Sequence, residues 1–296
     1  MCTECGCETP PLSEGLRITP RPHAVANDPF RLAPAGRKRI VLEHQLLSRN
    51  RNTATENRER FTRLGIRAIN LLSSPGAGKT SLLECSLKML GEISDGPEVL
   101  VIEGDQQTQL DADRIRACGT RTVQINTGHG CHLDAAMVQK ALDDLHEASS
   151  KDLADQDLNQ TLLFIENVGN LVCPALWDLG EESKVVLLSV AEGDDKPLKY
   201  PDMFAAADLI LINKVDLTPY TNFSMERALQ NCRAINPNAL ILPVSATRGD
   251  GMHAWIHWLI HPSAVQAGSP TVDDPGHEPE THRAGETARA PVSHSH

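Results

Sequence analysis

The sequence predicts an α/β protein whose mainly parallel, seven-stranded sheet is covered by helices on both faces. Seven short apolar runs recur along the chain, at residues 68–72, 99–102, 122–125, 161–165, 185–190, 209–212 and 239–244. Helical stretches separate most of these runs, and such alternation of strand and helix is typical of parallel sheets. The first run also leads through a glycine-bearing turn into a helical pattern at 81–90. We therefore expect functional side chains on the loops at the carboxyl ends of the strands.

The composition limits the possible partners of the protein. The 296 residues carry 28 basic and 39 acidic side chains, a net charge of −11. This balance argues against nucleic acid or an anionic membrane as the main partner. No apolar run approaches the length of a membrane span, and the N-terminus lacks an apolar signal core. We expect a cytoplasmic protein that binds neither nucleic acid nor membrane.

Three regions are predicted along the chain. Residues 1–36 form a flexible arm, residues 37–262 the main domain with a lead-in helix at 37–64, and residues 263–296 a disordered tail. The arm begins Met-Cys-Thr-Glu-Cys-Gly-Cys, so Cys2, Cys5 and Cys7 lie within six residues. Three thiolates at this spacing can converge on one soft or borderline metal ion. The alternatives are an accidental cluster or a redox trio.

Residues 73–80, Ser-Ser-Pro-Gly-Ala-Gly-Lys-Thr, predict a phosphate-binding P-loop of the kind found in P-loop NTPases. In such a loop successive backbone N–H groups surround the phosphates, Lys79 reaches the β- and γ-phosphates, and the Thr80 hydroxyl ligates Mg²⁺. Ser73 stands where the consensus has glycine. The alternative is a plain turn between a strand and a helix. The predicted phosphate-binding residues are Gly76, Ala77, Gly78, Lys79, Thr80 and Ser81.

Acidic residues follow two of the predicted strands. Asp105 follows the second run, where its carboxylate would hold Mg²⁺ directly or through water; alternatively, it caps the next helix. Glu166 follows the fourth run and precedes Asn-Val-Gly-Asn, where many nucleotide hydrolases place an acidic residue and a glycine near the γ-phosphate. Lys79, Asp105 and Glu166 are therefore the candidate catalytic residues.

The sixth and seventh strands are followed by segments that favour guanine. Asn213-Lys214-Val215-Asp216 fits a guanine-reading motif, because the carboxylate of Asp216 accepts hydrogen bonds from the N1–H and 2-amino groups of that base. A Ser245-Ala246 turn supplies a backbone N–H for the guanine O6. These segments indicate GTP as the nucleotide.

A second candidate metal site lies between the third and fourth strands. Cys131 and His132 follow the third strand, and Cys173 follows the fourth. Two thiolates and an imidazole suit Zn²⁺ or Ni²⁺. The alternative is three unrelated residues at strand ends. Because Cys173 lies close to Glu166 in the chain, a metal here would be coupled to the state of the nucleotide.

Over residues 38–262 the chain resembles the hydrogenase nickel-incorporation GTPases, the HypB proteins, which are SIMIBI-class P-loop GTPases. Five motifs carry the resemblance, at residues 71–80, 103–108, 130–134, 166–174 and 213–216. Serine at position 73 is usual in that family. The Cys-x-x-Cys-Gly-Cys segment resembles the high-affinity nickel site of some members. The chain lacks the long histidine run of other members, which argues against nickel storage.

The resemblance implies a slow GTPase, acting with Mg²⁺, that helps deliver Ni²⁺ to the large subunit of [NiFe]-hydrogenase together with a HypA-type metallochaperone. It also implies a GTP-dependent homodimer with the Cys131/His132/Cys173 site near the subunit interface. Three other interpretations stay open: a urease-type nickel GTPase, a metal buffer or sensor with vestigial nucleotide binding, and an ATP-dependent small-molecule kinase.

Overall fold

The computed structural model describes residues 34–105, 110–128, 130–147 and 161–261. The chain divides into two compact units, Met1–Ser48 and Arg49–His296. Residues 1–33 of the predicted arm, with Cys2, Cys5 and Cys7, and the whole predicted tail lie outside the described residues, whereas residues 34–36 of that arm are helical. None of the helices in the described ranges is long and apolar enough to cross a membrane.

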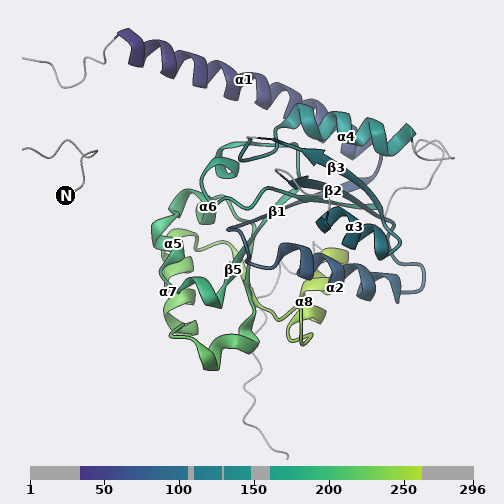
Figure 1. The fold of residues 1–296 in the computed structure, drawn as a ribbon, viewed down its shortest axis with the longest axis vertical. Coiled ribbons are helices and arrows are strands. Elements are labelled where there is room, and N and C mark those ends of the chain that lie inside the picture. The colour runs from purple at the N-terminus through teal and green to yellow at the C-terminus, as the bar shows by residue number, and fades with distance from the viewer. Residues whose placement is uncertain (1–33, 106–109, 129, 148–160, 262–296) are drawn as a thin grey trace, which may run out of the picture. The chain divides into compact units, whose positions relative to one another are not determined.

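The sheet has seven strands in the order β3-β2-β4-β1-β5-β6-β7, and every pair of neighbours is parallel (Figure 1). This confirms the predicted fold class. Each strand coincides with one of the apolar runs. The strands are β1 Ile66–Ser73, β2 Val99–Asp105, β3 Arg121–Asn126, β4 Thr161–Glu166, β5 Ser183–Ser189, β6 Leu209–Asn213 and β7 Leu240–Pro243.

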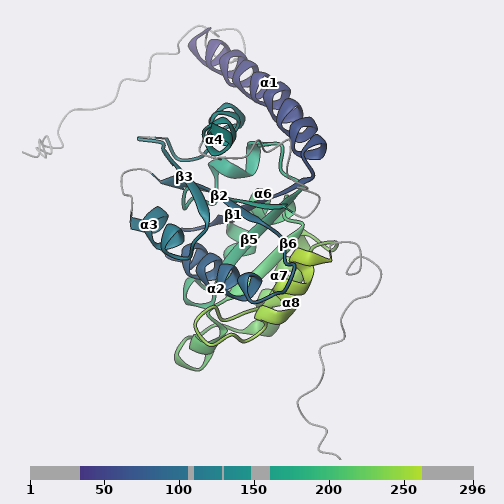
Figure 2. The same ribbon diagram turned by 90° about the vertical axis from the view of Figure 1, so that its right-hand side faces the viewer.

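Helices cover both faces of the sheet (Figure 2). One face packs against α2, α3 and α8, and the other packs against α4, α6, α7 and the part of α1 that follows Ser48. The α-helices are α1 Pro34–Arg63, α2 Lys79–Gly91, α3 Leu110–Ala117, α4 Ala135–Glu147, α5 Lys196–Lys199, α6 Pro201–Ala205, α7 Met225–Ile235 and α8 Met252–Ile260. Short 3₁₀ segments occupy η2 Cys173–Leu176, η3 Val190–Glu192 and η4 Val215–Tyr220.

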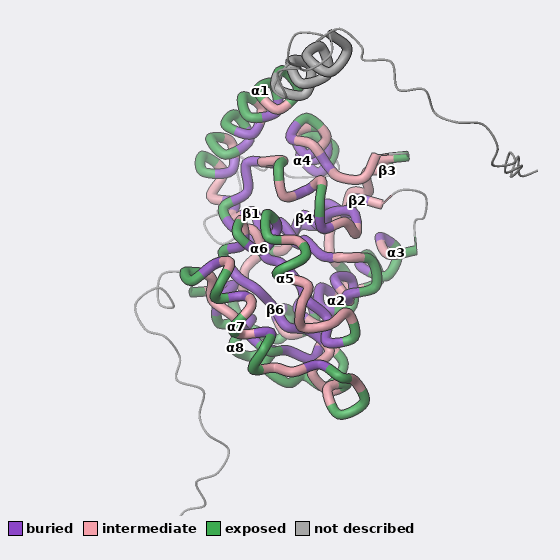
Figure 3. The backbone as a smooth tube through the Cα atoms, turned by 90° about the vertical axis from the view of Figure 1, so that its left-hand side faces the viewer, coloured by how far each residue is buried: buried purple, intermediate pink, exposed green. Residues whose placement is uncertain are grey.

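The core follows the two-residue period of the strands. Along β1, Ile69 and Leu71 join the core beneath α2 and α8, whereas Ala68 and Leu72 face the opposite helices. The central strands are therefore buried on both sides, as Figure 3 shows for the centre of the molecule, whereas the edge strands β3 and β7 are mostly half-buried. Such a doubly covered sheet leaves only its strand ends open for binding, and the carboxyl ends carry the site described below.

Candidate functional site

The loop between β1 and α2 has the backbone geometry of a phosphate-binding loop. Gly76 and Gly78 have φ angles of 75° and 99°, in the left-handed region that glycine adopts most readily. A Cβ on Gly78 would lie 2.7 Å from the side-chain nitrogen of Asn213, so only glycine fits there. The helix α2 then begins at Lys79, and its first N–H groups point toward the loop opening.

Ser73, the residue that departs from the consensus, contacts the lysine of the loop. The Lys79 ammonium donates to Ser73 Oγ at 2.9 Å, and both side chains are buried. Burial lowers the pKa of Lys79, although Glu166 and other carboxylates oppose that effect. The serine thus gives a buried ammonium a partner at the place where phosphate oxygens would lie.

Acidic side chains surround Thr80 at the ends of β2 and β4. The Thr80 hydroxyl donates to Glu166 Oε1 at 2.8 Å. The other carboxylate oxygen of Glu166, and Glu103 Oε2, are buried without a hydrogen-bond partner. Burial raises the pKa of Glu166 and, with the neighbouring carboxylates Glu166 and Asp105, raises the pKa of Glu103 to about 8. Buried carboxyl oxygens beside a P-loop threonine fit a divalent cation such as Mg²⁺.

Glu103 is a site residue that the sequence prediction missed. The prediction selected Asp105, at the end of the strand, because residues after a strand reach the loop edge. Glu103 is two residues earlier, on the same side of β2, since side chains alternate along a strand. An acidic residue inside an otherwise apolar strand was the signal that could have found it.

These groups line a cavity of about 490 Å³ over the P-loop. The cavity also reaches Asp111 and Arg114 on α3 and Lys214 after β6, of which the prediction had included only Lys214. Gly169, on the loop after β4, closes tightly on the P-loop: a Cβ there would lie 3.0 Å from the backbone of Pro75. The loop that follows Glu166 therefore touches the phosphate-binding loop directly.

The predicted guanine-reading segment is hydrogen-bonded to the P-loop. Asn213 Nδ2 donates to the carbonyl of Ala77 at 2.9 Å, and Lys214 Nζ donates to that of Gly76 at 2.7 Å. Lys214 has a φ of 63°, a left-handed conformation that is uncommon for a non-glycine residue and found at functional sites. This segment thus joins the ends of β1 and β6 into one nucleotide-sized site.

Asp216 and Ser245, two of the residues predicted to contact the base, are hydrogen-bonded to each other. Ser245 Oγ donates to Asp216 Oδ1 at 2.6 Å, which orients the carboxylate. The backbone N–H of Ser245 already donates to the Asp250 carbonyl at 2.8 Å. Within the predicted Ser245-Ala246 turn, the N–H suited to a base oxygen is therefore that of Ala246.

Cys131, His132 and Cys173 meet at the same edge of the sheet. Their ligand atoms all lie within 4.8 Å of one another, which makes them the one group of at least three potential metal-binding side chains among the described residues. Cys131 Sγ lies 3.5 Å from His132 Nδ1. Two thiols and an imidazole at this spacing match the donor set of a Zn²⁺ or Ni²⁺ site with a position left for water or another ligand.

The surroundings of the triad favour the uncharged forms of its side chains. Burial lowers the pKa of His132, which keeps the imidazole neutral. The pKa of Cys131 is raised, first by its hydrogen bond with Cys173 and then by burial, so a bound cation would have to displace the thiol proton. The His132 ring packs on Trp177, with 4.3 Å between ring centroids.

Asn167 connects the metal triad to the nucleotide cavity. Its Oδ1 accepts from the backbone N–H of Leu133, next to His132, at 3.1 Å and from Val168 at 3.0 Å. Leu133 also packs over the end of β2, where a Cβ on Gly104 would lie 2.8 Å from it. The loop after Glu166 is therefore hydrogen-bonded to the residue beside His132.

The fold and the phosphate loop define a P-loop nucleotide-binding protein. Residues 67–243 match the nucleotide-binding domain of the CobW/HypB/UreG family. The hydrogenase maturation factor HypB of Azotobacter vinelandii is 53% identical over 220 residues, which cover 74% of this chain and 68% of that protein. The chain belongs to the HypB family of hydrogenase maturation factors, within the CobW/HypB/UreG nucleotide-binding proteins.

Related proteins agree in fold and extend the range of clients. A crystal structure of HypB from Helicobacter pylori in complex with nickel superposes with a TM-score of 0.66 at 38% identity, covering 74% of this chain and 95% of that one. A hydrogenase/urease maturation factor HypB from the same species is 39% identical over 224 residues, covering 76% of this chain and 88% of that protein.

Proposed function

We propose that this protein is a GTP-hydrolysing nickel metallochaperone that assists nickel insertion into [NiFe]-hydrogenase. The observation that carries the proposal is the position of the Cys131/His132/Cys173 triad, which lies on the two loops that meet Asn167 beside the nucleotide cavity. A maturation factor whose metal donors and nucleotide site share a loop has the means to time metal release by hydrolysis.

In this proposal GTP occupies the cavity, with its phosphates on the P-loop and its base between Lys214 and the Ala246 N–H. Asp216, oriented by Ser245, accepts from the N1–H and 2-amino groups of guanine. Adenine does not present these donors, which supports GTP over ATP and argues against the kinase interpretation. Lys79 leaves Ser73 and pairs with the β- and γ-phosphates, which gives a buried ammonium a stronger partner.

Thr80, Asp105 and Glu166, with Glu103 behind them, would hold Mg²⁺. The ion, when bound, neutralises charge on the β- and γ-phosphates. With Mg²⁺ bound, the Thr80 hydroxyl oxygen would ligate the ion in place of its present hydrogen bond to Glu166, and the Glu166 carboxylate would contact either the ion or the attacking water. Among the described residues that line the cavity, the one arginine is Arg114, and it pairs with Glu84 and Asp111 instead of reaching toward the phosphates. We therefore expect slow turnover, on the order of 10⁻⁴ to 10⁻² per second.

In the proposal the protein carries Ni²⁺, and Zn²⁺ competes for the same two thiolates and imidazole. In the proposal Cys2, Cys5 and Cys7 of the N-terminal arm form a separate nickel site. Val172 and Leu176, on either side of Cys173, are 59% and 62% exposed. Apolar side chains beside a half-open metal site support a GTP-dependent homodimer there, with a HypA-type metallochaperone and the hydrogenase large subunit as further partners.

The test is hydrolysis of GTP and ATP by the wild type and by Lys79→Ala, with Ni²⁺ or Zn²⁺ titrated into each. We expect turnover of GTP only, loss of that turnover in Lys79→Ala, and a metal-dependent rate that Cys131→Ser or Cys173→Ser abolishes. A preference for ATP would contradict the proposal. Metal binding without any GTP turnover would instead support a metal buffer or sensor.

A second client is urease, and the hydrogenase/urease factor of Helicobacter pylori is the observation that favours it. Complementation of strains that lack the factor separates the two possibilities. Restored hydrogenase activity alone supports the main proposal, and restored urease activity alone supports a urease-type nickel GTPase.

A further inference from the structure

Two buried asparagines interrupt the apolar face of α1. Asn50, Ala54, Asn57 and Phe61 lie on one stripe of the helix, and all four are buried. Asparagine is a poor helix former, and a buried amide costs free energy unless it is hydrogen-bonded. Aliphatic residues at these positions would favour packing, so the contacts of the two amides indicate why asparagine is present.

The two amides hold the start of α4, which follows the first two metal donors. Asn50 Oδ1 accepts from the backbone N–H of Ala135 at 2.8 Å, and Asn57 Nδ2 donates to the carbonyl of the same residue at 2.8 Å. Ala135 begins α4 and comes three residues after His132. Both the backbone N–H and the backbone carbonyl of Ala135 are therefore hydrogen-bonded to α1.

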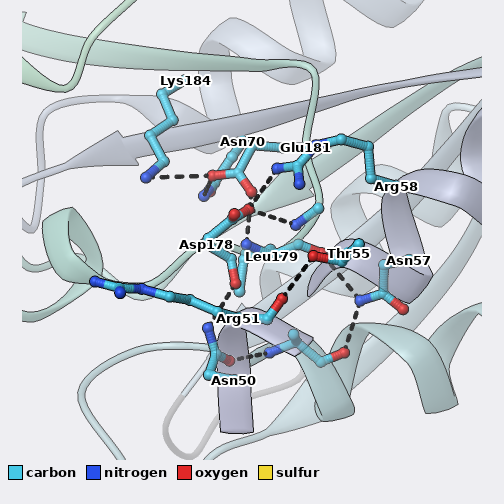
Figure 4. A network of polar contacts seen from close by, with 12 residues as sticks. Asn50, Arg51, Thr55, Asn57, Arg58, Asn70, Asp178, Leu179, Glu181 and Lys184 are labelled. Carbon is cyan, nitrogen blue, oxygen red and sulfur yellow. Dashed lines mark hydrogen bonds and ion pairs between the residues drawn. The ribbon is translucent and has the colours of Figure 1, made fainter. Parts of the chain in front are cut away.

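The same amides hold the segment that follows the third metal donor. Asn50 Nδ2 donates to the carbonyl of Asp178 at 2.7 Å, and Asn57 Nδ2 donates to that of Leu179 at 3.0 Å. Figure 4 shows Asn50 and Asn57 beside Asp178 and Leu179 of this segment. The single NH₂ group of Asn57 thus bonds both segments, and its loss would remove one hydrogen bond from each, leaving only those made by Asn50.

The second segment cannot shift easily against the helix. Gly180 has a φ of 91°, and a Cβ there would lie 2.6 Å from the Ala54 carbonyl and 2.7 Å from Asn57 Cβ. Glu181 Oε2 accepts from the Leu179 N–H at 2.6 Å, and its Oε1 accepts from Asn70 Nδ2 at 3.1 Å (Figure 4). The turn is therefore anchored to α1 on one side and to the central strand β1 on the other.

We infer that Asn50 and Asn57 are positioning residues for the metal site: they fix the separation between the Cys131/His132 segment and the Cys173 segment. The inference rests on the proposed function, in which this triad binds Ni²⁺. Metal affinity depends on the groups that orient the ligands as well as on the ligands themselves. Loss of the hydrogen bonds that Asn50 and Asn57 make would then alter the affinity for the metal ion, although neither residue is a metal ligand.

The experiment uses the full-length chain with Cys2, Cys5 and Cys7 changed to Ser, so that only the internal site reports. Asn57→Leu removes the amide of Asn57 and keeps a side chain of similar volume, and Asn50→Ala removes the amide of Asn50. The matched control is Asn52→Ala, because Asn52 is an exposed asparagine of the same helix. Ni²⁺ affinity is measured against a competing chelator. The Co²⁺ absorption spectrum reports ligand geometry, and GDP affinity and thermal melting report folding.

We expect Asn57→Leu to weaken Ni²⁺ binding about tenfold and to change the Co²⁺ spectrum, with GDP affinity within about twofold of the parent. Asn50→Ala should weaken Ni²⁺ binding by about threefold to tenfold, and it carries the test alone if Asn57→Leu does not fold. Asn52→Ala should change neither Ni²⁺ binding nor the spectrum.

Two different failures are distinguishable. If the parent binds Ni²⁺ no better than its Cys173→Ser variant, the internal metal site of the proposed function is wrong. If the parent binds Ni²⁺ through Cys173 but both asparagine variants match its affinity and spectrum, the positioning role is wrong. An equal loss in Asn52→Ala would also overturn it, because the effect would then belong to the helix in general.

Discussion

The nucleotide site and the metal site share one edge of the sheet but are built in different ways. The phosphate loop is a continuous segment from Ser73 to Thr80, and backbone N–H groups supply most of its binding capacity. The metal site takes three side chains from two loops, with Cys173 far along the chain from Cys131. Local backbone geometry therefore makes the first site, whereas long-range contacts make the second.

The two sites also differ in exposure. Lys79 and Glu166 are buried, so charges in the nucleotide site interact in a low dielectric and bind strongly. Cys131, His132 and Cys173 are each half-buried, which leaves a route for an ion to enter and leave. The comparison suggests a fixed nucleotide site and an adjustable metal site, joined at Asn167.

The largest expected effect is on the nucleotide site alone. Lys79→Ala should lower single-turnover GTP hydrolysis by about 10²- to 10³-fold, because it removes a preorganised charge from the developing phosphate oxygens. Ni²⁺ binding at the internal site should stay within about twofold, since no triad residue contacts Lys79. Lys88→Ala, an exposed lysine of the same helix, is the control. Unchanged turnover in Lys79→Ala would refute the assignment.

The base specificity should depend on Asp216. Asp216→Asn should weaken GTP binding by about 10- to 100-fold, because hydrogen bonds to a charged acceptor are lost. The same change should favour XTP, whose 2-oxo group accepts from the new amide. Competition binding with the two nucleotides measures the shift, and Asp202→Asn, an exposed aspartate on α6, should leave it unchanged. An equal affinity of the variant and wild type for GTP would rule out this base contact.

The buried carboxylates should make stability depend on pH when nucleotide and Mg²⁺ are absent. The pKa of Glu103 is about 8 in the folded protein against 4.5 for the free side chain, so its contribution is present below pH 4.5 and is lost as pH rises through 8. Glu103→Gln should reduce the loss of unfolding free energy between pH 5 and pH 8 by about 1 kcal/mol or more. Urea midpoints in a chelating buffer measure it.

The matched control for this pH series is Glu92→Gln, which changes an exposed glutamate after α2. It should show the same pH dependence as the wild type. If Glu103→Gln also does so, Glu103 does not carry the buried proton. Added Mg²⁺ and GDP should raise stability most at high pH, where the carboxylates are ionised.

The smallest expected effect is on the connection between the two sites. Asn167→Ala removes the acceptor for the Leu133 N–H, so the difference in Ni²⁺ affinity between the GDP-bound protein and the protein bound to a non-hydrolysable GTP analogue should shrink by about fivefold. Asn126→Ala, an exposed asparagine at the end of β3, should leave that difference intact. An unaltered difference in Asn167→Ala would show that coupling runs by another route.

Prediction from sequence worked where chemistry is carried by neighbouring residues. The seven strands and the P-loop could be predicted because apolar runs and glycine turns are local signals in the sequence. Glu103 was missed because its burial depends on how β2 pairs with β3 and β4, which no local pattern records. Similarly, the sequence predicted a backbone N–H from the Ser245-Ala246 turn without saying which one, and the structure shows that the Ser245 N–H donates to the Asp250 carbonyl.

By itself the sequence determined the fold class and the phosphate loop, and it predicted the residue types of a candidate guanine site and the donor set of a candidate metal site, because each depends on the identity or spacing of near neighbours. Only the tertiary structure decided that Cys173 reaches Cys131 and His132, that Ser73 holds Lys79, and that Asn50 and Asn57 fasten both metal-bearing segments to α1. These contacts depend on packing between distant segments, and many sequences with the same local patterns would pack differently.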